Sequence, residues 1–179
     1  MASSPTMPLD GIRVIDMTTT LAGPYGSQIL GDFGADVIKI EAPNGEAIRN
    51  AGPQRSQGMA ATFMCCNRNK RSAVLDLKTS AGKDALWKLL DTAQVFLHAI
   101  RPQKIAALGF DPASVMERRP DIVYAALHGY HEHGPYGGRP APGGRHRRAE
   151  TPRPAGRPAD LRRRPRQKGP RRPTARRRI

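Results

Sequence analysis

The sequence predicts an α/β fold with a Rossmann-like parallel sheet, on three observations. Short apolar runs rich in Val and Ile alternate with helical patterns over residues 11–129. The runs are nearly continuously apolar, which is typical of strands that are covered on both faces of a parallel sheet. The chain has 179 residues, which is room for one domain with an appendage. Because the pattern stops near residue 141, we expect the N-terminal part of a doubly wound domain.

The elements follow one another in strand–helix order. Five strands are expected, over residues 11–17, 36–41, 72–77, 94–100 and 121–129. Three helices are expected between them, within residues 23–35, 78–93 and 111–120. In the first helix Pro24 suits the first turn and Gly34 suits the C-terminal cap. The second helix has the clearest apolar stripe, and Thr79 or Ser80 can cap it.

The charge is distributed very unevenly along the chain. The formal net charge is +15, but residues 141–179 hold 15 of the 30 Lys and Arg residues against two acids, a balance of +13. Residues 1–140 have 15 basic and 13 acidic residues, a balance of +2, so this part has no electrostatic feature of a nucleic-acid binder. In residues 141–179 the only large apolar residues are Leu161 and Ile179. We expect a domain over residues 1–141 and a disordered, Arg/Pro-rich tail over residues 142–179.

Three motifs carry a resemblance to a known family. They are "GADVIKIE", "NKRS" followed by "LDLK", and a strand that leads to "GPYGGRPA", and they lie within residues 8–141. In order and spacing they resemble the N-terminal part of the family III CoA-transferases, which include formyl-CoA and carnitine-CoA transferases and the α-methylacyl-CoA racemases. The resemblance implies a Rossmann-like core, an interlaced homodimer, and CoA with an acyl-CoA or carboxylic acid as partners. It implies a CoA thioester as substrate and no permanently bound cofactor.

The resemblance also assigns candidate CoA contacts by position in the motifs. They are Leu21 and Ala22 after the first strand, Leu75, Asp76, Leu77 and Lys78 beside the adenosine, Ala99, Ile100 and Arg101 along the pantetheine and phosphates, and His128, Gly129 and Tyr130 near the thioester. A guanidinium grips a phosphate with two donors, which suits Arg101. Ala42 stands where some members have an Arg for the CoA phosphate. We expect Lys39 and Glu41 to fix the strand edge rather than to do chemistry.

The family's chemistry depends on a carboxylate that we do not find in this chain. In the transferases an Asp attacks the acyl-CoA carbonyl and forms a mixed anhydride. The racemases use a His and an Asp to move the α-proton. The resemblance places the key Asp tens of residues beyond "GPYGGRPA", where only Asp160 stands among Arg and Pro without a surrounding motif. We therefore assign no catalytic residue and expect no transferase activity.

The tail suggests a change of reading frame near residues 139–144. Residues 144–148 are Gly-Arg-His-Arg-Arg. One allowed codon set, GGA CGT CAT CGC CGC, shifted by one base gives Asp-Val-Ile-Ala-Ala, close to what the family places there. Arg, Pro, Gly and Ala are also the residues that GC-rich codons give in a wrong frame. Our hypothesis is an N-terminal CoA-transferase fragment with a frameshifted tail.

Other interpretations stay open at this point. One is a fragment of an α-methylacyl-CoA racemase, and another is a basic protein that associates with nucleic acid through its tail. The cluster His128, His131 and His133 suggests a metal, but the irregular loop lacks a distant fourth ligand and we assign no metal site. No run approaches the ~20 apolar residues of a membrane span. With adjacent Cys65 and Cys66 as the only cysteines, we expect a cytoplasmic protein without a membrane anchor.

Overall fold

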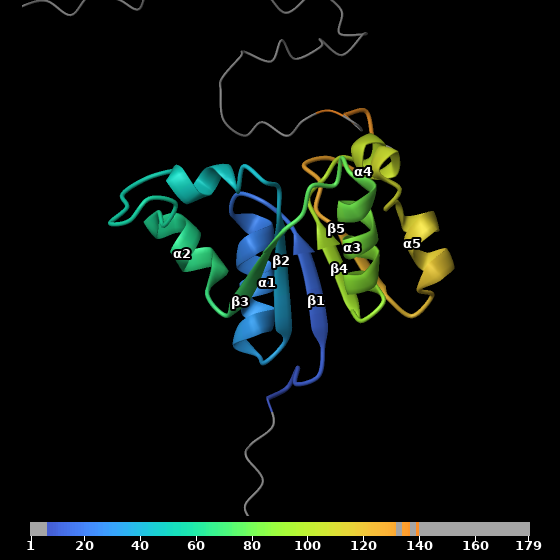
Figure 1. Ribbon diagram of the computed structural model, residues 1–179, viewed down its shortest axis with the longest axis horizontal. Helices are drawn as coiled ribbons and strands as arrows, with labels where there is room; N and C mark the ends of the chain where they lie inside the picture. Colours follow the sequence, from blue (N-terminus) through green and yellow to red (C-terminus); the bar gives the residue numbers. More distant parts are fainter. Residues whose placement is uncertain (1–6, 132–133, 137–138, 140–179) are drawn as a thin grey trace, which may run out of the picture. The chain divides into compact units, whose positions relative to one another are not determined.

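The computed structural model describes residues 7–131, 134–136 and 139 (Figure 1). Within these residues one parallel sheet is built from five strands: β1 (Arg13–Met17), β2 (Asp36–Glu41), β3 (Lys70–Val74), β4 (Val95–His98) and β5 (Val123–Ala126). The strand order is β3-β2-β1-β4-β5, and every neighbouring pair is parallel. This confirms the predicted α/β fold class.

Helices and one 3-10 turn connect the strands. The elements are α1 (Ala22–Asp32), η1 (Ala47–Asn50), α2 (Ala61–Asn67), α3 (Ser80–Leu90), α4 (Pro102–Leu108) and α5 (Pro112–Arg118). The three predicted helices correspond to α1, α3 and α5, whereas α2 and α4 were not predicted. The third strand was predicted over residues 72–77 but ends at Val74, so the following residues form a loop.

The helix ends follow from individual residues. Thr79 caps α3, because its hydroxyl oxygen accepts a hydrogen bond from the Gly82 amide at 3.1 Å. The chain leaves α1 through Gly34, whose φ of +100° is a conformation that glycine adopts without cost. A Cβ at this position would also lie 2.6 Å from the Met7 Cβ. Gly34 therefore ends α1 as the sequence predicts.

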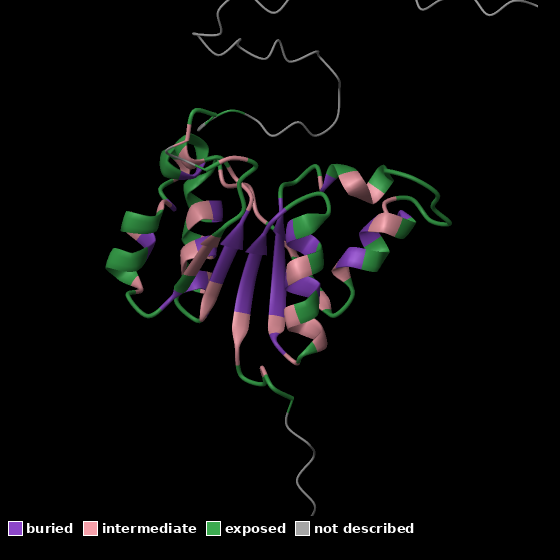
Figure 2. Ribbon diagram, turned by 180° about the vertical axis from the view of Figure 1, so that it is seen from behind, coloured by how far each residue is buried: buried purple, intermediate pink, exposed green. Residues whose placement is uncertain are grey.

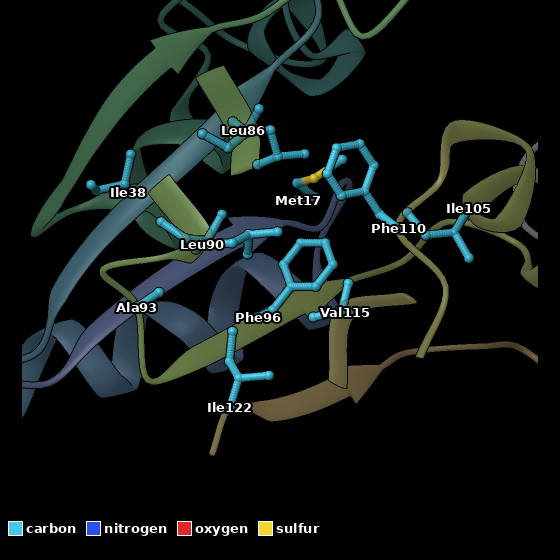
Figure 3. Packing of buried hydrophobic residues seen from close by; sticks show 12 residues of the cluster. Met17, Ile38, Leu86, Leu90, Ala93, Phe96, Ile105, Phe110, Val115 and Ile122 are labelled. Carbon is cyan, nitrogen blue, oxygen red and sulfur yellow. The ribbon is translucent and has the colours of Figure 1, made fainter. Parts of the chain in front are cut away.

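One face of the sheet carries the main apolar core (Figure 3). The sheet, the helices α3, α4 and α5 and the segments that connect them contribute twelve buried residues: Ile15, Met17, Ile38, Ile40, Leu86, Leu90, Ala93, Phe96, Ile105, Phe110, Val115 and Ile122. Trp87 packs at the edge of this core, with its ring centroid 4.8 Å from that of Phe110. The alternation of side chains along β1 and β2 places the odd and even residues on opposite faces, so the other face has a different set.

The opposite face has a small apolar cluster and several buried charges. Val14, Ala35 and Val37 are buried there, with Leu30 of α1 packed against them. The neighbouring residues Asp16, Lys39 and Glu41 are also buried. Figure 2 shows the central strands buried over most of their length. Helix α1 faces this layer with small and polar residues, which are Gly23, Pro24, Ser27 and Gln28.

The strands at the two ends of the sheet are less covered. β5 lies at one edge, and Val123 on it is 60% exposed. Among the described residues no helix is long and apolar enough to cross a membrane. The tail that was predicted to be disordered, residues 142–179, lies outside the described part of the chain.

Candidate functional site

A cavity of about 480 Å³, the first cavity, opens at the carboxyl edge of the sheet. In open α/β sheets ligands bind at this edge, where the order of the strands reverses. The reversal here lies between β1 and β4. The cavity is lined by Met17, Thr19, Ile40, Glu41, Ala42, Pro43, Asn44, Leu75, Asp76, Leu77, Lys78, Ile100 and Leu108. Its volume is in the range of small-molecule sites, and its walls are mostly apolar with a few polar groups.

Five of the predicted site residues meet in the first cavity. They are Leu75, Asp76, Leu77, Lys78 and Ile100, and Ala42 lies on the same wall. The first four come from the loop after β3 and Ile100 from the loop after β4, so the fold joins segments that are more than twenty residues apart. Three lining residues carry charge, namely Glu41, Asp76 and Lys78.

The wall formed by residues 75–78 is held by its own turn and by α3. The Asp76 carboxylate accepts from the Lys78 amide at 3.0 Å, and the Thr79 hydroxyl donates to the Asp76 carbonyl at 2.8 Å. Gly82 of α3 lies so close that a Cβ on it would be 2.1 Å from the Asp76 carbonyl oxygen. The helix therefore packs directly on the loop backbone, and the wall has one defined position.

Other predicted residues lie outside the lining of this cavity. Leu21 precedes α1, is 49% exposed and makes no side-chain cap, and Ala22 is the first residue of that helix. Arg101 is exposed and precedes α4, and Ala99 is half-buried between two of the predicted contacts. All four lie in loops or helix starts that follow β1 and β4.

His128 belongs to a second cavity of about 240 Å³. This second cavity is lined by His98, Pro102, Ile105, Ala106, Asp111, Pro112, Tyr124, Ala126 and His128. The His128 Nε2 lies 3.1 Å from the carbonyl oxygen of Ile100, whose side chain lines the first cavity. Gly129 is exposed and Tyr130 is half-buried, with its ring centroid 5.4 Å from that of Tyr136. The structure thus separates His128 from residues 75–78 while linking both cavities through Ile100.

His98 is a buried polar residue that sequence reasoning did not single out. Its Nδ1 accepts from the Ile100 amide at 3.1 Å, so the neutral ring carries its proton on Nε2, which lies 2.8 Å from the Tyr124 hydroxyl. That hydroxyl donates to the Phe110 carbonyl at 2.9 Å. Burial lowers the pKa of His98 to about 4, and the nearby His128 adds to this effect. His98 lies near the carboxyl end of the strand predicted over residues 94–100, and this placement is the sequence feature that could have identified it as a site residue.

Beside the first cavity, buried charges form what we call the charged layer: Asp16, Lys39, Glu41, Glu46, Arg49 and Lys70. The Asp16 carboxylate accepts from the amide and hydroxyl of Thr18 at 2.8 and 2.5 Å and from the Ser27 hydroxyl at 2.6 Å. Lys70 lies 3.1 Å from the same carboxylate, and its side chain is 2% exposed. Burial lowers the pKa of Lys70, while Asp16 opposes this shift. These contacts join β1, α1 and β3.

Lys39 and Glu46 continue the layer under the loop that follows β1. The Lys39 Nζ donates to the Thr18 carbonyl at 2.9 Å and lies 2.7 Å from the Glu46 carboxylate. The Thr20 amide donates to the other oxygen of Glu46. The side chains of Lys39 and Glu46 are 2% and 4% exposed. The expectation that Lys39 fixes the strand edge is too narrow, because its charge reaches the loop beyond β1.

Glu41 and Arg49 connect the layer to the cavity wall. The Arg49 guanidinium donates to both carboxylate oxygens of Glu41, at 2.6 and 2.5 Å, and it also lies 3.9 Å from the Phe63 ring centroid. The Ser72 hydroxyl donates to Glu41 at 2.7 Å, across from β3. These hydrogen bonds, chiefly those from Arg49, hold the pKa of Glu41 at about 2 against the effect of burial. Glu41 therefore fixes the strand edge, as expected, while it also lines the first cavity.

No metal site emerges from the described residues. They contain no group of three or more His, Cys, Asp and Glu side chains placed to hold an ion. Of the predicted histidine cluster, His133 lies outside the described residues. Cys65 is exposed and Cys66 is buried on α2, and both are free thiols.

A comparison of the chain with models of known protein families identifies its family. The model of CoA-transferase family III matches residues 9–146. The chain belongs to CoA-transferase family III. The matched region contains both cavities, the charged layer and all the predicted CoA contacts.

Individual members of CoA-transferase family III are similar over the same region. The chain is 45% identical over 141 residues to Rv3272, a probable fatty acyl-CoA transferase of Mycobacterium tuberculosis, covering 77% of this chain and 36% of that protein. It is 40% identical over 136 residues to a succinate–glutarate CoA-transferase of Agrobacterium fabrum, covering 72% and 34%. The chain thus spans about a third of the length of these relatives.

Solved structures of the family share the fold. A crystal structure of Rv3272 superposes with a TM-score of 0.69 at 43% identity, covering 77% of this chain and 36% of that one. A CAIB/BAIF family protein from Brucella suis superposes with a TM-score of 0.73 at 35% identity, covering 76% and 37%. The fold described above is therefore shared with these solved structures.

Proposed function

We propose that this chain is the CoA-binding, N-terminal part of an enzyme that transfers CoA between an acyl-CoA and a carboxylic acid. The observation that carries the proposal is the first cavity at the strand-order reversal, where five of the motif-assigned residues converge. The relatives named above are CoA-transferases, which favours transfer over the racemase alternative.

The chemistry of the cavity suits one end of CoA. Leu75, Leu77 and Ile100 offer apolar walls for an adenine ring, and Lys78 offers a cation for a phosphate. Arg101 is exposed directly before α4, and one residue after Ile100 it offers a second cation for the phosphates of CoA. In this proposal the thioester end of CoA extends toward Leu21, Ala22 and the loop that carries His128, Gly129 and Tyr130.

Binding of CoA to the 179-residue chain tests this proposal by isothermal titration calorimetry. We expect Lys78→Gln to weaken binding about tenfold, because a hydrogen bond assisted by charge contributes about 1.5 kcal/mol. Lys88→Gln is the matched control. Lys88 is an exposed cation in the last turn of α3, the helix that follows Lys78, and it does not line the cavity. Absence of CoA binding by the unmodified chain, or an equal loss in both variants, contradicts the proposal.

The proposal includes the absence of transferase activity from this chain. The carboxylate that the resemblance requires would lie beyond residue 141, where we propose that a frameshift replaced the family sequence. The test is to sequence the source DNA from codon 135 onward and to translate all frames. A second frame that continues with Asp-Val-Ile-Ala-like sequence supports the frameshift, whereas a single open frame contradicts it. The interlaced homodimer stays a prediction of the resemblance for the complete enzyme, and the cytoplasmic location stays a prediction from the residues of the sequence.

A further inference from the structure

We propose that the buried ion pair of Lys39 and Glu46 positions the loop of residues 18–21 to receive the thioester end of CoA. The inference rests on the proposed function and adds two positioning residues to it. Neither residue lines the first cavity, and neither is among the motif-assigned contacts. Their role would be to act through the backbone of the loop that follows β1.

The contacts of the pair are directed at loop backbone. Lys39 donates to the Thr18 carbonyl at 2.9 Å, and Glu46 accepts from the Thr20 amide. The pair thus holds one acceptor and one donor of the loop, two residues apart, on either side of Thr19. Thr19 lines the first cavity, which takes the nucleotide end of CoA in the proposed function. The loop then continues to Leu21 and Ala22, toward which the thioester end extends in the same proposal.

The loop needs such support because one of its residues has a strained backbone. Thr20 has a φ of +73°, a conformation that costs a β-branched residue of the order of 1–3 kcal/mol. A conformation of this kind persists when surrounding contacts fix it. The Glu46 carboxylate, bound to the amide of this same residue, supplies the contact.

Stability alone is a weak reason for burying these charges. The Lys39 and Glu46 side chains are almost fully removed from solvent, and a buried ion pair is often no more stabilising than apolar residues of similar volume. What the pair provides that apolar residues cannot is a donor and an acceptor for the loop. The double variant Lys39→Met/Glu46→Met separates these two roles, since it removes both charges together with the donor and the acceptor and leaves no unpaired buried ion.

The first measurement is amide hydrogen exchange on the full chain without ligand. In the double variant we expect the Thr20 amide to exchange at least about tenfold faster, because it loses the Glu46 acceptor and the Thr18 carbonyl beside it loses the Lys39 donor. Arg118→Gln is the control, since Arg118 pairs with Asp91 at 2.5 Å on α5 and α3, away from both cavities. Unchanged exchange of the Thr20 amide in the double variant overturns the inference, whether or not the chain binds CoA.

The second measurement compares two ligands that differ in reach. Adenosine 3′,5′-bisphosphate has the nucleotide end of CoA without the pantetheine arm, whereas acetyl-CoA has both. We expect the double variant to bind acetyl-CoA about tenfold more weakly and the bisphosphate within about twofold of the unmodified chain. A role in overall folding would weaken both ligands equally, and that result overturns the inference. If the unmodified chain binds neither ligand, the proposed function fails, and the exchange experiment still decides whether the pair holds the loop.

Discussion

The two faces of the same sheet are stabilised in different ways. On the α3 side, alternate residues of β1 and β2 are Ile15, Met17, Ile38 and Ile40, and they pack into an apolar core. On the α1 side the same strands present Asp16, Lys39 and Glu41, all buried and all paired. Adjacent residues of one strand therefore serve two purposes.

The difference shows which face of the sheet fixes the positions of individual backbone groups. Apolar packing has no direction and fixes the sheet against α3, whereas hydrogen bonds and ion pairs have direction and fix particular backbone groups. The charged layer holds the loop after β1 and the wall of the first cavity, both at the carboxyl edge. The face with the buried charges is thus the one that defines the shape of that edge.

The largest loss of stability is expected for a substitution in the apolar face. Phe96→Ala removes a fully buried ring that contacts Tyr124 and His98, so we expect a loss of about 4 kcal/mol in the free energy of unfolding. Val95→Ala on the other face of the same strand should cost only about 1 kcal/mol. Urea denaturation followed by circular dichroism measures both. Equal losses would mean that the two faces contribute equally to stability.

A similar but smaller loss is expected when one charge is removed from the other face. Lys70→Met leaves Asp16 buried with its negative charge uncompensated, and we expect it to lower the free energy of unfolding by about 3 kcal/mol. Adding Asp16→Asn should recover more than half of that loss, because it removes the unpaired charge while the remaining carbonyl oxygen still accepts from the Thr18 amide and hydroxyl. The same urea experiment measures the double-mutant cycle. If Asp16→Asn increases the loss in the free energy of unfolding instead, the ion pair of Asp16 and Lys70 contributes net stability.

The two faces should lose stability in different ranges of pH. The folded pKa of His98, about 4, is below its ordinary value of 6.5, so the unfolded chain binds the extra proton first. Stability is then complete above pH 6.5 and falls by about 3 kcal/mol as the pH drops toward 4. Glu41, with a folded pKa of about 2 against 4.5, contributes stability that is lost only as the pH drops from 4.5 toward 2.

Thermal melting at stepped pH values separates these contributions. His98→Gln should flatten the dependence of the melting temperature between pH 6.5 and 4.5, whereas Glu41→Gln should leave that range unchanged and flatten the range below it. A slope between pH 6.5 and 4.5 that persists in the His98 variant assigns it to other groups.

The smallest effect is expected for charges that belong to neither face. Arg118 and Asp91 form an ion pair of 2.5 Å between side chains that are 49% and 36% exposed. Such pairs contribute less than about 1 kcal/mol, so Arg118→Gln should change the urea midpoint only slightly, and less still at 0.5 M salt. A loss comparable to that of Lys70→Met would remove the contrast between buried and exposed charges.

The sequence predicted the strands better than it predicted the contacts between them. Apolar runs place β1, β2, β4 and β5 because a parallel sheet needs continuous burial. Helix α4 was missed although Pro102 at its first position and Gly109 after its last, with a φ of +85°, are start and stop features. Helix α2 has only seven residues and no side-chain cap, so the sequence offers little to detect it.

The candidate site was predicted in part, through the resemblance. The motifs assigned residues 75–78 and Ile100, and these segments converge because both follow parallel strands. The charged layer was not predicted, because its pairs join distant residues such as Asp16 and Lys70. Nothing in a single sequence indicates which charge within a strand will meet which partner. Tertiary packing alone decides this.

Most large apolar side chains of α1 and of its two flanking residues lie on the exposed side, whereas Leu30 packs against the sheet. Because the inner face of α1 meets the charged layer with small and polar residues, Leu21, Tyr25, Ile29 and Phe33 follow one another at four-residue intervals along the exposed side. An algorithm that orients helices by hydropathy would turn this one the wrong way. The same row can be used to improve solubility. Tyr25 and Phe33 are at least half exposed, so hydrophilic residues can replace them without leaving a cavity in the core.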